Sequence, residues 1–351
     1  MVSVSQERLF IAANNGDIGG GEVMLLAIAE AARALGKSIV IVAPSAPESL
    51  LLEARKRGFE TVEIPAKSRQ RYLFGLRKWR KKTGTQSLLW CNGLLPAAAT
   101  GGMKHRIVHL HQLPTGKLKA AWAFARRSAS VVLVPSAHMK REISNAVLFS
   151  NWSDEIRVLD EATDFSGHDV RIGFIGRFSS DKGLPILIDA LNLAARKSDV
   201  TLRLVLAGGP KFVDIDDQRR IVEAIEDSEV PVDLLGWVRP EQFFAKIDIA
   251  VVPSVWAEPF GLVATEAMSA RVPLVVSDAG ALPEIVGSEY PWIAEAGDTE
   301  SLAETILNVI RCPESKKVAV VQSAFERWDL LYSPKAGRES VKKLLRTIEG
   351  K

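Results

Sequence analysis

Short runs of aliphatic and β-branched residues alternate with longer stretches of helical periodicity along the chain. Such alternation is typical of βαβ units, in which helices connect the strands of a parallel sheet. The pattern forms two series, the second of which starts at Val170, and the other expected strands span 10–13, 38–43, 61–64, 87–91, 106–110, 131–134, 202–207, 232–235, 249–252 and 273–276. A pattern that starts again predicts two α/β domains, each with a Rossmann-like parallel sheet.

The length and composition agree with two globular domains. A chain of 351 residues is longer than one hydrophobic core usually spans, and 47% apolar with 25% charged residues is an ordinary balance. The polar stretch 160–169 lacks periodicity, so we expect an N-terminal domain over 1–165, a C-terminal domain over 166–329 and a last helix, at about 330–351, that returns to the first domain. Cys91 and Cys312 lie far apart and in no metal-binding pattern, so neither a disulfide nor a zinc site is expected.

No segment of the sequence is long and apolar enough for a transmembrane helix, since runs such as 202–207 fall far short of roughly 20 residues. The first residues also lack the pattern of a secretory signal, which predicts a cytoplasmic protein. Residues 1–166 contain 23 Lys and Arg against 14 Asp and Glu, whereas the remainder contains 22 against 28. The resulting net charges of +9 and −6 indicate an anionic partner for the first domain.

The densest positive charge lies in 67–82, where eight basic residues occur without an acidic one. The apolar residues interleaved with them are Tyr72, Leu73, Phe74, Leu76 and Trp79. Cations beside apolar side chains favour an anionic membrane surface, so we expect peripheral attachment at the inner face of the membrane. An ordinary surface helix with a packed aromatic side is the alternative, and nucleic acid is not expected because no groove-reading module accompanies the charge.

A glycine-rich turn, 14–22, follows the first expected strand and opens a helix. Glycines such as Gly19 and Gly20 let the backbone approach an anion closely, and the N–H groups at a helix N-terminus carry partial positive charge. The spacing does not fit G-x-G-x-x-G, so a nicotinamide site has little support, and a tight strand-to-helix turn is the alternative.

A second strand-end turn, within 171–183, carries the two cations Arg177 and Lys182. Ligands of open α/β sheets bind at the carboxyl ends of the strands, and an arginine fork beside a lysine ammonium suits a diphosphate. Two solvated surface charges are the simpler interpretation of this turn taken alone.

The segment 253–268 follows a further apolar strand and contains two acids, Glu258 and Glu266, separated by seven residues. Gly261 lets the backbone turn tightly, and a helix that begins there directs its N–H groups toward a bound phosphate. With Glu258 before the helix and Glu266 on it, the two carboxylates can reach different parts of one ligand. A capping role for Glu258 and a solvent-facing Glu266 are the alternative.

Together these motifs resemble those of the retaining glycosyltransferases of GT-B family 4. The 253–268 segment resembles the E-x7-E element of that family. The other matching elements are the glycine loop with Gly19, Gly20 and Glu22, the phosphate-binding pair Arg177 and Lys182, and the strand-end turns 207–210 and 235–238. The likeness extends over most of the chain and keeps the order of the motifs.

The resemblance implies the GT-B fold, in which two Rossmann-like domains face a central cleft. It also implies transfer of a hexose from a nucleotide-diphosphate sugar to a glycan or lipid-linked acceptor, with retention of configuration, in bacterial envelope polysaccharide synthesis. Arg177 and Lys182 would stabilise the leaving diphosphate and Glu258 would contact the hexose hydroxyls. The implied donor-binding residues are Gly19, Gly20, Gly209, Phe260, Gly261, Leu262 and, at the ribose, Glu266. No metal cofactor is expected, because fixed cations and helix dipoles can stabilise the departing charge.

The family also places a histidine facing the sugar, and His111, at the end of the expected strand 106–110, is the candidate. His109 is its rival, because residues two apart on a strand share a face. We prefer His111, which lies nearer the carboxyl end of the strand.

Three stretches depart from the family pattern or admit another interpretation. Ala270-Arg271-Val272 stands where a small residue and a glycine are usual, and 160–164 replaces a turn that contains Asn-Gly. The triplet Asp214-Ile215-Asp216 resembles the metal-binding D-x-D of the other glycosyltransferase fold, but we interpret it as a solvated loop, with a divalent-ion site as the alternative. For the whole chain, the alternatives are a GT-B epimerase or phosphorylase, a catalytically inactive binding subunit and a nucleic-acid-binding protein.

Overall fold

The computed structural model describes residues 8–83, 86–158, 170–211 and 213–350. Its contacts group the chain into two compact units: the residues up to Trp152 together with those from Pro334 onward, and Ser153–Ser333. The chain thus leaves the first unit before residue 165, because the segment that begins at Ser153 packs on the second unit, where Ser153 N donates to Tyr332 O at 3.1 Å. The expected linker, 160–169, lies outside the described residues.

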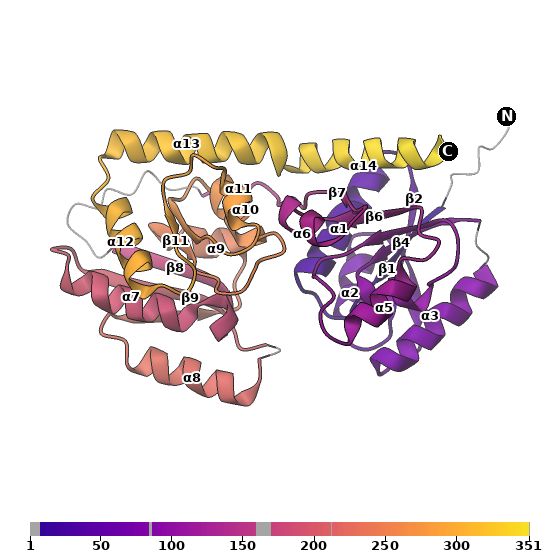
Figure 1. Cartoon of the computed structure of the whole chain (residues 1–351), viewed down its shortest axis with the longest axis horizontal. Coiled ribbons are helices and arrows are strands. Elements are labelled where there is room, and N and C mark those ends of the chain that lie inside the picture. The colour runs from indigo at the N-terminus through magenta and orange to yellow at the C-terminus, as the bar shows by residue number, and fades with distance from the viewer. Residues whose placement is uncertain (1–7, 84–85, 159–169, 212, 351) are drawn as a thin grey trace. The chain divides into compact units, whose positions relative to one another are not determined.

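The first unit is built from alternating strands and helices. Its strands are β1 (Arg8–Ala13), β2 (Ser38–Pro44), β3 (Glu60–Ile64), β4 (Leu88–Asn92), β5 (Arg106–His109), β6 (Val131–Val134) and β7 (Val147–Leu148). Its helices are α1 (Gly20–Ala34), α2 (Ser49–Lys56), α3 (Arg69–Thr83), α4 (Leu94–Ala99), α5 (Leu118–Ala125), α6 (Ala137–Glu142) and α14 (Pro334–Glu349). The strands form one parallel sheet in the order β3-β2-β1-β4-β5-β6-β7 (Figure 1).

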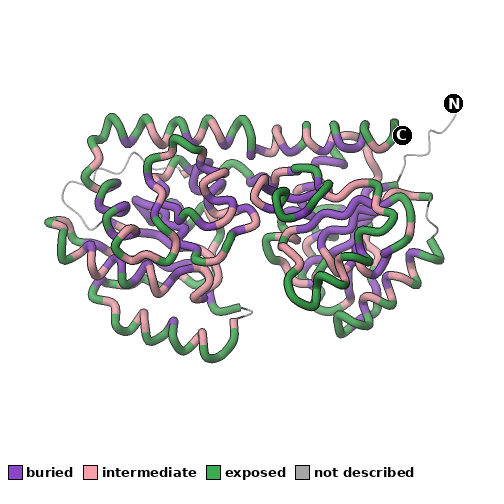
Figure 2. The backbone as a smooth tube through the Cα atoms, in the orientation of Figure 1, coloured by how far each residue is buried: buried purple, intermediate pink, exposed green. Residues whose placement is uncertain are grey.

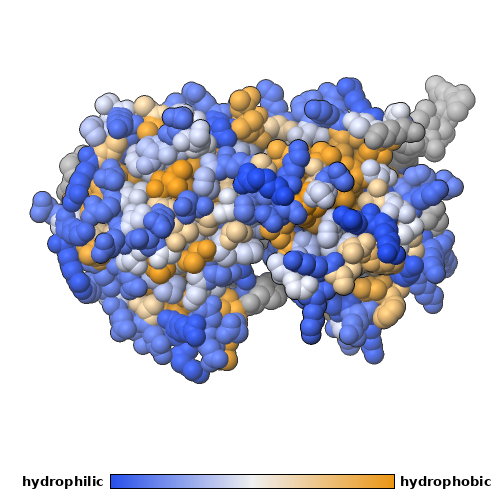
Figure 3. All heavy atoms as spheres, in the orientation of Figure 1, coloured by the Kyte–Doolittle hydropathy of each residue, from blue (hydrophilic) through white to orange (hydrophobic). Residues whose placement is uncertain are grey.

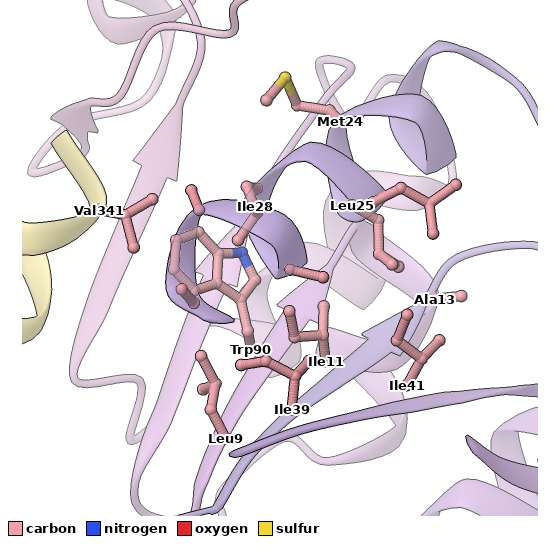
Figure 4. Packing of buried hydrophobic residues seen from close by; sticks show 14 of the residues in the cluster. Leu9, Ile11, Ala13, Met24, Leu25, Ile28, Ile39, Ile41, Trp90 and Val341 are labelled. Atoms are coloured by element: carbon pink, nitrogen blue, oxygen red, sulfur yellow. The ribbon is translucent and has the colours of Figure 1, made fainter. Parts of the chain in front are cut away.

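Both faces of this sheet are buried, as the continuous apolar runs of parallel strands require. Leu9 and Ile11 of β1 belong to a hydrophobic core that also contains residues of α1, α2 and α14. The indole of Trp90 lies in this core (Figure 4). Phe10 and Ala12 point to the opposite face, where α3, α4, α5 and α6 contribute the buried residues. This alternation along β1 follows the two-residue period of a strand.

The second unit repeats the architecture. Its strands are β8 (Val170–Arg177), β9 (Leu202–Gly209), β10 (Val232–Gly236), β11 (Ile249–Val252), β12 (Leu274–Ser277) and β13 (Ile293–Ala294), in the parallel order β10-β9-β8-β11-β12-β13. Its helices are α7 (Leu184–Arg196), α8 (Ile215–Glu226), α9 (Pro240–Phe244), α10 (Leu262–Ser269), α11 (Leu282–Val286), α12 (Thr299–Ile310) and α13 (Glu314–Leu331). Figure 2 shows the buried residues concentrated along the strands of each sheet.

Each sheet has a topological switch point, where successive crossovers leave in opposite directions. It lies between β1 and β4 in the first sheet and between β8 and β11 in the second. Ligands of open α/β sheets bind outside the carboxyl ends of the strands at such a point. The segments that follow β1, β4, β8 and β11 are therefore where a ligand site is expected.

Arg271 stands at a position where the family usually has a glycine, and it adopts a backbone conformation that favours glycine. It adopts a φ of +55°, the left-handed conformation that glycine adopts readily. Its guanidinium lies 3.5 Å from the centroid of the Phe325 ring, a stabilising cation–π contact. The arginine therefore takes the backbone conformation of the glycine that it replaces.

The surface is polar over much of the face shown in Figure 3, with apolar residues in smaller groups between the charges. Within the described ranges, no helix combines the length and the hydropathy needed to cross a bilayer.

Candidate active site

The turn that carries Arg177 and Lys182 lies at the switch point of the second sheet. Arg177 is the last residue of β8, and Lys182 ends a short 3₁₀ turn before α7. Gly183 caps α7 with a φ of +74°, and a Cβ atom there would lie 1.8 Å from the carbonyl oxygen of Pro253. Only glycine fits this position, so the turn after β8 lies directly against the loop after β11. The two cations thus lie beside a helix N-terminus, an arrangement suited to an anion.

Lys182 and Glu258 form an ion pair, with Nζ 2.5 Å from Oε1. Glu258 is 6% exposed, and the same Oε1 accepts a hydrogen bond from Ser254 Oγ at 2.5 Å. The ammonium also lies 5.5 Å from the centroid of the Trp256 ring. Such partners offset part of the free-energy cost of burying a carboxylate. The fold therefore joins one residue of the predicted phosphate pair to the first acid of the E-x7-E element.

Glu258 does not cap the helix that follows it, because the N-cap of α10 is Gly261. Its backbone is instead fixed by a close approach of Gly280, whose φ is +63° and whose added Cβ would lie 2.3 Å from Glu258 N. The carbonyl oxygen of Glu258 accepts from Ala281 N at 2.9 Å. The loop after β12 therefore holds Glu258 against Lys182.

Asp181 is a site residue that the motif analysis missed. Its carboxylate lies 3.1 Å from Arg177 Nη2 and accepts a hydrogen bond from Ser179 Oγ, while its carbonyl oxygen accepts from Val255 N at 3.0 Å. It therefore holds the arginine and joins the two loops. Ser254 was missed as well, although both are polar residues beside motif positions at strand ends, a signal that was available in the sequence.

Glu266 lies on α10 and is half-buried. Burial, with smaller contributions from the negative charges of Glu241 and Asp154, raises its pKa to about 7. At neutral pH this carboxyl group therefore exists in both protonation states. Gly261, at the start of the same helix, has a φ of +108°, a conformation that favours glycine.

The remaining predicted donor residues of this unit differ in accessibility. Phe260 is 3% exposed and packs on Tyr332 with ring centroids 5.6 Å apart, so its side chain lies in the core and is not free to contact a donor. Leu262 is half-buried at the start of α10. Gly209 ends β9, and a Cβ atom there would lie 3.2 Å from Nε1 of Trp237, a residue that is 67% exposed.

The aspartate triplet at 214–216 is solvated, as expected, but it begins helix α8 and does not lie in a loop. Asp214 is the N-cap of α8, and its Oδ1 accepts from Asp217 N at 3.0 Å. The Asp217 carboxylate accepts from Ser180 N at 3.1 Å and so ties α8 to the turn after β8. Helix capping accounts for Asp214, and the described part of the chain contains no group of three His, Cys, Asp or Glu side chains placed to hold a metal ion.

A second cluster lies at the switch point of the first sheet. Gly19 is the N-cap of α1, which begins at Gly20. Glu22, in the first turn, is 6% exposed and accepts a hydrogen bond from Asn15 N at 3.1 Å, and burial raises its pKa to about 7. The glycine loop is thus folded around a buried carboxyl group.

His111 rather than His109 lies against this loop. A Cβ atom on Gly21 would lie 3.4 Å from His111 Cδ2, and His111 Nε2 is 2.9 Å from Asn92 Oδ1. His109 is fully buried in β5, and the centroid of its ring lies 4.2 Å from that of the His111 ring. Its two ring nitrogens have no hydrogen-bond partner among the described residues. Burial lowers the pKa of both histidines, and that of His111 falls to about 4. His109 is therefore a core residue.

The comparison with known families concerns the second unit. Residues 169–312 match the family described as glycosyl transferases group 1. This segment belongs to that family. It contains Arg177, Lys182, Glu258 and Glu266, the charged residues that the motif analysis selected in this unit as candidate site residues.

Curated relatives resemble parts of this chain. Lipopolysaccharide 1,2-N-acetylglucosaminetransferase of Salmonella typhimurium is 25% identical over 217 residues, 59% of this chain and 54% of that protein. D-inositol 3-phosphate glycosyltransferase of Corynebacterium kroppenstedtii is 28% identical over 163 residues, 45% of this chain and 36% of that protein. The chain thus aligns with about half or less of the length of these relatives.

Solved structures resemble nearly the whole fold. The Anabaena protein HepE in complex with UDP and glucose has a TM-score of 0.82 at 20% identity and covers 97% of this chain and 100% of its own. Sucrose-phosphate synthase of Thermosynechococcus elongatus has a TM-score of 0.80 at 18% identity, over 98% of this chain and 99% of its own. The fold of the chain is GT-B, with two Rossmann-like domains.

Proposed function

We propose that this group 1 glycosyltransferase transfers a hexose from a nucleotide-diphosphate sugar to a glycan or lipid-linked acceptor. The observation that carries the proposal is the ion pair between Lys182 and Glu258. The pair lies at the switch point of the second sheet. There the Lys182 ammonium, which can bind a phosphate, lies beside the Glu258 carboxylate, which can accept hydrogen bonds from sugar hydroxyls. Curated relatives with names from lipopolysaccharide and capsular polysaccharide synthesis support an acceptor in a bacterial envelope pathway.

The proposed reaction retains the anomeric configuration. The bond between the anomeric carbon and the diphosphate oxygen breaks, and the acceptor oxygen bonds to the same face of the sugar. The acceptor proton passes to the departing diphosphate, so no further base is required. Arg177 and Lys182 stabilise the negative charge on the leaving group, Glu258 holds the hexose hydroxyls and Glu266 the ribose.

The donor residues of the first unit are assigned by their place in its switch-point cluster. Gly19 and Gly20 open α1, whose first N–H groups are suited to an anionic or polar group of the donor. His111 lies against the same loop and is assigned to the sugar.

Transfer is expected to survive EDTA. The cations of Arg177 and Lys182 supply the charge that a divalent ion supplies in metal-dependent enzymes. The purified chain is screened against a panel of nucleotide sugars by thermal shift, and one member at a hundred times its Kd is expected to stabilise the fold by about 2.7 kcal/mol. That donor is then assayed with EDTA and lipid-linked glycan acceptors, and the anomer of the product is read by NMR.

Three outcomes contradict the proposal in different ways. Absence of a thermal shift with every nucleotide sugar refutes the donor class. Loss of transfer in EDTA, restored by Mg²⁺, refutes the metal-independent mechanism. Isomerised donor without acceptor identifies an epimerase instead.

We further propose that the first unit attaches to anionic membrane from the cytoplasmic side. The structure changes which residues of 67–82 serve this role. Tyr72 and Leu76 are buried in the core and Trp79 packs on Phe10 with ring centroids 5.3 Å apart, so these three cannot enter the headgroups as expected from the sequence. Phe74 is 71% exposed and remains available.

Helix α5 extends the basic surface next to α3. The ring of the exposed Phe124 on α5 lies 6.0 Å from the guanidinium of the half-buried Arg77 on α3, so the two helices are neighbours at this point. Leu118 on α5 is 52% exposed. The exposed cations of the two segments are Lys67, Arg69, Arg71, Lys78, Lys81, Lys82, Lys117, Lys119, Arg126 and Arg127. Each cation near an anionic bilayer contributes about 1 kcal/mol.

Reversal of four exposed cations of α3 to glutamate is expected to abolish flotation with phosphatidylserine vesicles while transfer to a soluble acceptor persists. The four are Arg71, Lys78, Lys81 and Lys82, and Arg77 is excluded because its Nη1 bonds to Ala99 O at 3.0 Å. The matched control reverses four exposed cations of α14, on the opposite face of the same sheet: Lys335, Arg338, Lys343 and Arg346. Equal flotation of both variants contradicts the proposal, as does strong binding to neutral vesicles.

A further inference from the structure

Asn92 lies between the glycine loop and His111. It is the last residue of β4 and is fully buried. Its Nδ2 donates to the carbonyl oxygen of Gly21 at 2.8 Å, and its Oδ1 lies 2.9 Å from His111 Nε2. One amide group therefore joins the start of α1 to the ring that follows β5.

These two contacts fix the direction of the amide. A backbone carbonyl oxygen can only accept, so the nitrogen of Asn92 must face Gly21. Its oxygen then faces His111, and because this oxygen also can only accept, Nε2 of the ring must carry the proton. In a neutral ring the other nitrogen, Nδ1, is then left with a lone pair.

His111 Nδ1 is buried and has no hydrogen-bond partner among the described residues. Burial keeps the ring neutral, since it lowers the pKa of His111 to about 4. An unprotonated nitrogen in this position accepts a hydrogen bond from a hydroxyl group and repels a phosphate oxygen or a carbonyl oxygen. A sugar hydroxyl is the donor-substrate group with this chemistry.

We propose that Asn92 is a positioning residue that holds His111 in the Nε2–H form, so that Nδ1 accepts a hydrogen bond from a hydroxyl group of the donor sugar. The identity of the hydroxyl-bearing ligand rests on the proposed glycosyl transfer, whereas the proton position does not. His111 thus acts as a neutral acceptor and not as an acid or a charge stabiliser. The same contact fixes the loop, because loss of Asn92 also releases the Gly21 carbonyl.

The proton position is tested on the ligand-free protein by NMR of ¹⁵N-labelled histidine. We expect His111 to show a protonated Nε2 and a bare Nδ1, with no protonation near neutral pH. A protonated Nδ1, or an equal mixture of the two forms, overturns the proposal whether or not the protein transfers sugar.

Asn92→Asp separates positioning from simple packing, because it keeps the shape and the acceptor but adds a negative charge against Nε2–H. An anion at hydrogen-bond distance stabilises the protonated ring, so the pKa of His111 is expected to rise by at least about one pH unit. His109, whose ring lies against that of His111, is followed in the same spectra. The matched control is Asn14→Asp, which adds a carboxylate at the same sheet edge, where Asn14 Oδ1 accepts from Leu95 N at 3.0 Å. An equal change in both variants, or none in Asn92→Asp, overturns the proposal.

The effect on transfer is read from a double-mutant cycle with the donor found in the panel. Asn92→Ala and His111→Ala are each expected to lower kcat/KM by roughly tenfold, because each costs the same hydrogen bond between the sugar hydroxyl and His111 Nδ1, and the double variant is expected to lose little more. Fully additive losses overturn the assignment of Asn92 to His111. If no donor is turned over, the proposed function fails while the spectroscopic result stands.

Discussion

Replacement of Arg177 or Lys182 by alanine is expected to lower donor turnover at least roughly tenfold, and up to about 100-fold, with the protein still folded. Each change removes a cation that stabilises charge on the leaving diphosphate, and such electrostatic terms are among the largest in enzyme catalysis. The effect should fall mainly on kcat, because the charge develops in the transition state. Steady-state kinetics with the donor from the panel measure it.

The surface of the same unit offers matched controls. Arg196 pairs with Glu229, and Lys197 pairs with Glu304 at 2.7 Å, and both pairs are more exposed than the ion pairs of the candidate site. Arg196→Ala and Lys197→Ala remove the same charges and are expected to change turnover less than twofold, since exposed pairs contribute little. Near-normal turnover in Arg177→Ala or Lys182→Ala refutes the mechanism, and an equal loss in the controls attributes the effect to net charge.

Gly183→Ala is expected to lower the free energy of unfolding of the second unit by at least about 3 kcal/mol. The left-handed conformation alone costs roughly 1–2 kcal/mol for a residue with a Cβ atom, and that atom would lie 1.8 Å from Pro253 O, so the two loops must separate. The matched control is Gly236→Ala, which has a φ of +65° but nothing within 4 Å of the added atom.

Urea unfolding of the two variants measures the difference. The control should lose only the conformational cost, about 1–2 kcal/mol. If the two variants unfold alike, the contact between the turn after β8 and the loop after β11 does not exist in solution. If Gly183→Ala folds but no longer binds the donor, the same contact is required for the site.

The long strands were predictable because their apolar runs are continuous. Strands β2 and β9 extend over seven and eight residues, begin at the predicted residues and end one and two residues later than predicted. The two-residue strands β7 and β13 were missed, because two residues show no periodicity and their pairing depends on the neighbouring strand. The early exit at Trp152 was also missed, since it depends on packing between segments far apart in sequence.

The candidate site was predictable where motif residues follow strands, and much less so for the residues that hold them. Arg177, Lys182 and Glu258 were selected from their motifs, and the fold joins Lys182 to Glu258. Asn92 was missed, because its partners Gly21 and His111 are brought close only by the sheet order. Asp181 was missed although its carboxylate contacts Arg177, a motif residue of the same turn. For α3, the membrane prediction gave the positive charge more weight than the spacing of the apolar residues. Tyr72 and Leu76 are four residues apart, the spacing of residues on one buried face of a helix.

The pairing of Lys182 with Glu258 has a consequence for product inhibition. A phosphate that takes the lysine leaves a nearly buried carboxylate without its cation, which is unfavourable unless other donors replace it. A nucleotide sugar brings hydroxyl groups for Glu258 together with its phosphates, whereas inorganic phosphate and a spent nucleoside diphosphate bring no hexose. On the proposed mechanism we therefore expect the ion pair to re-form once the sugar has left, and inorganic phosphate and the spent nucleoside diphosphate to bind more weakly than the nucleotide sugar.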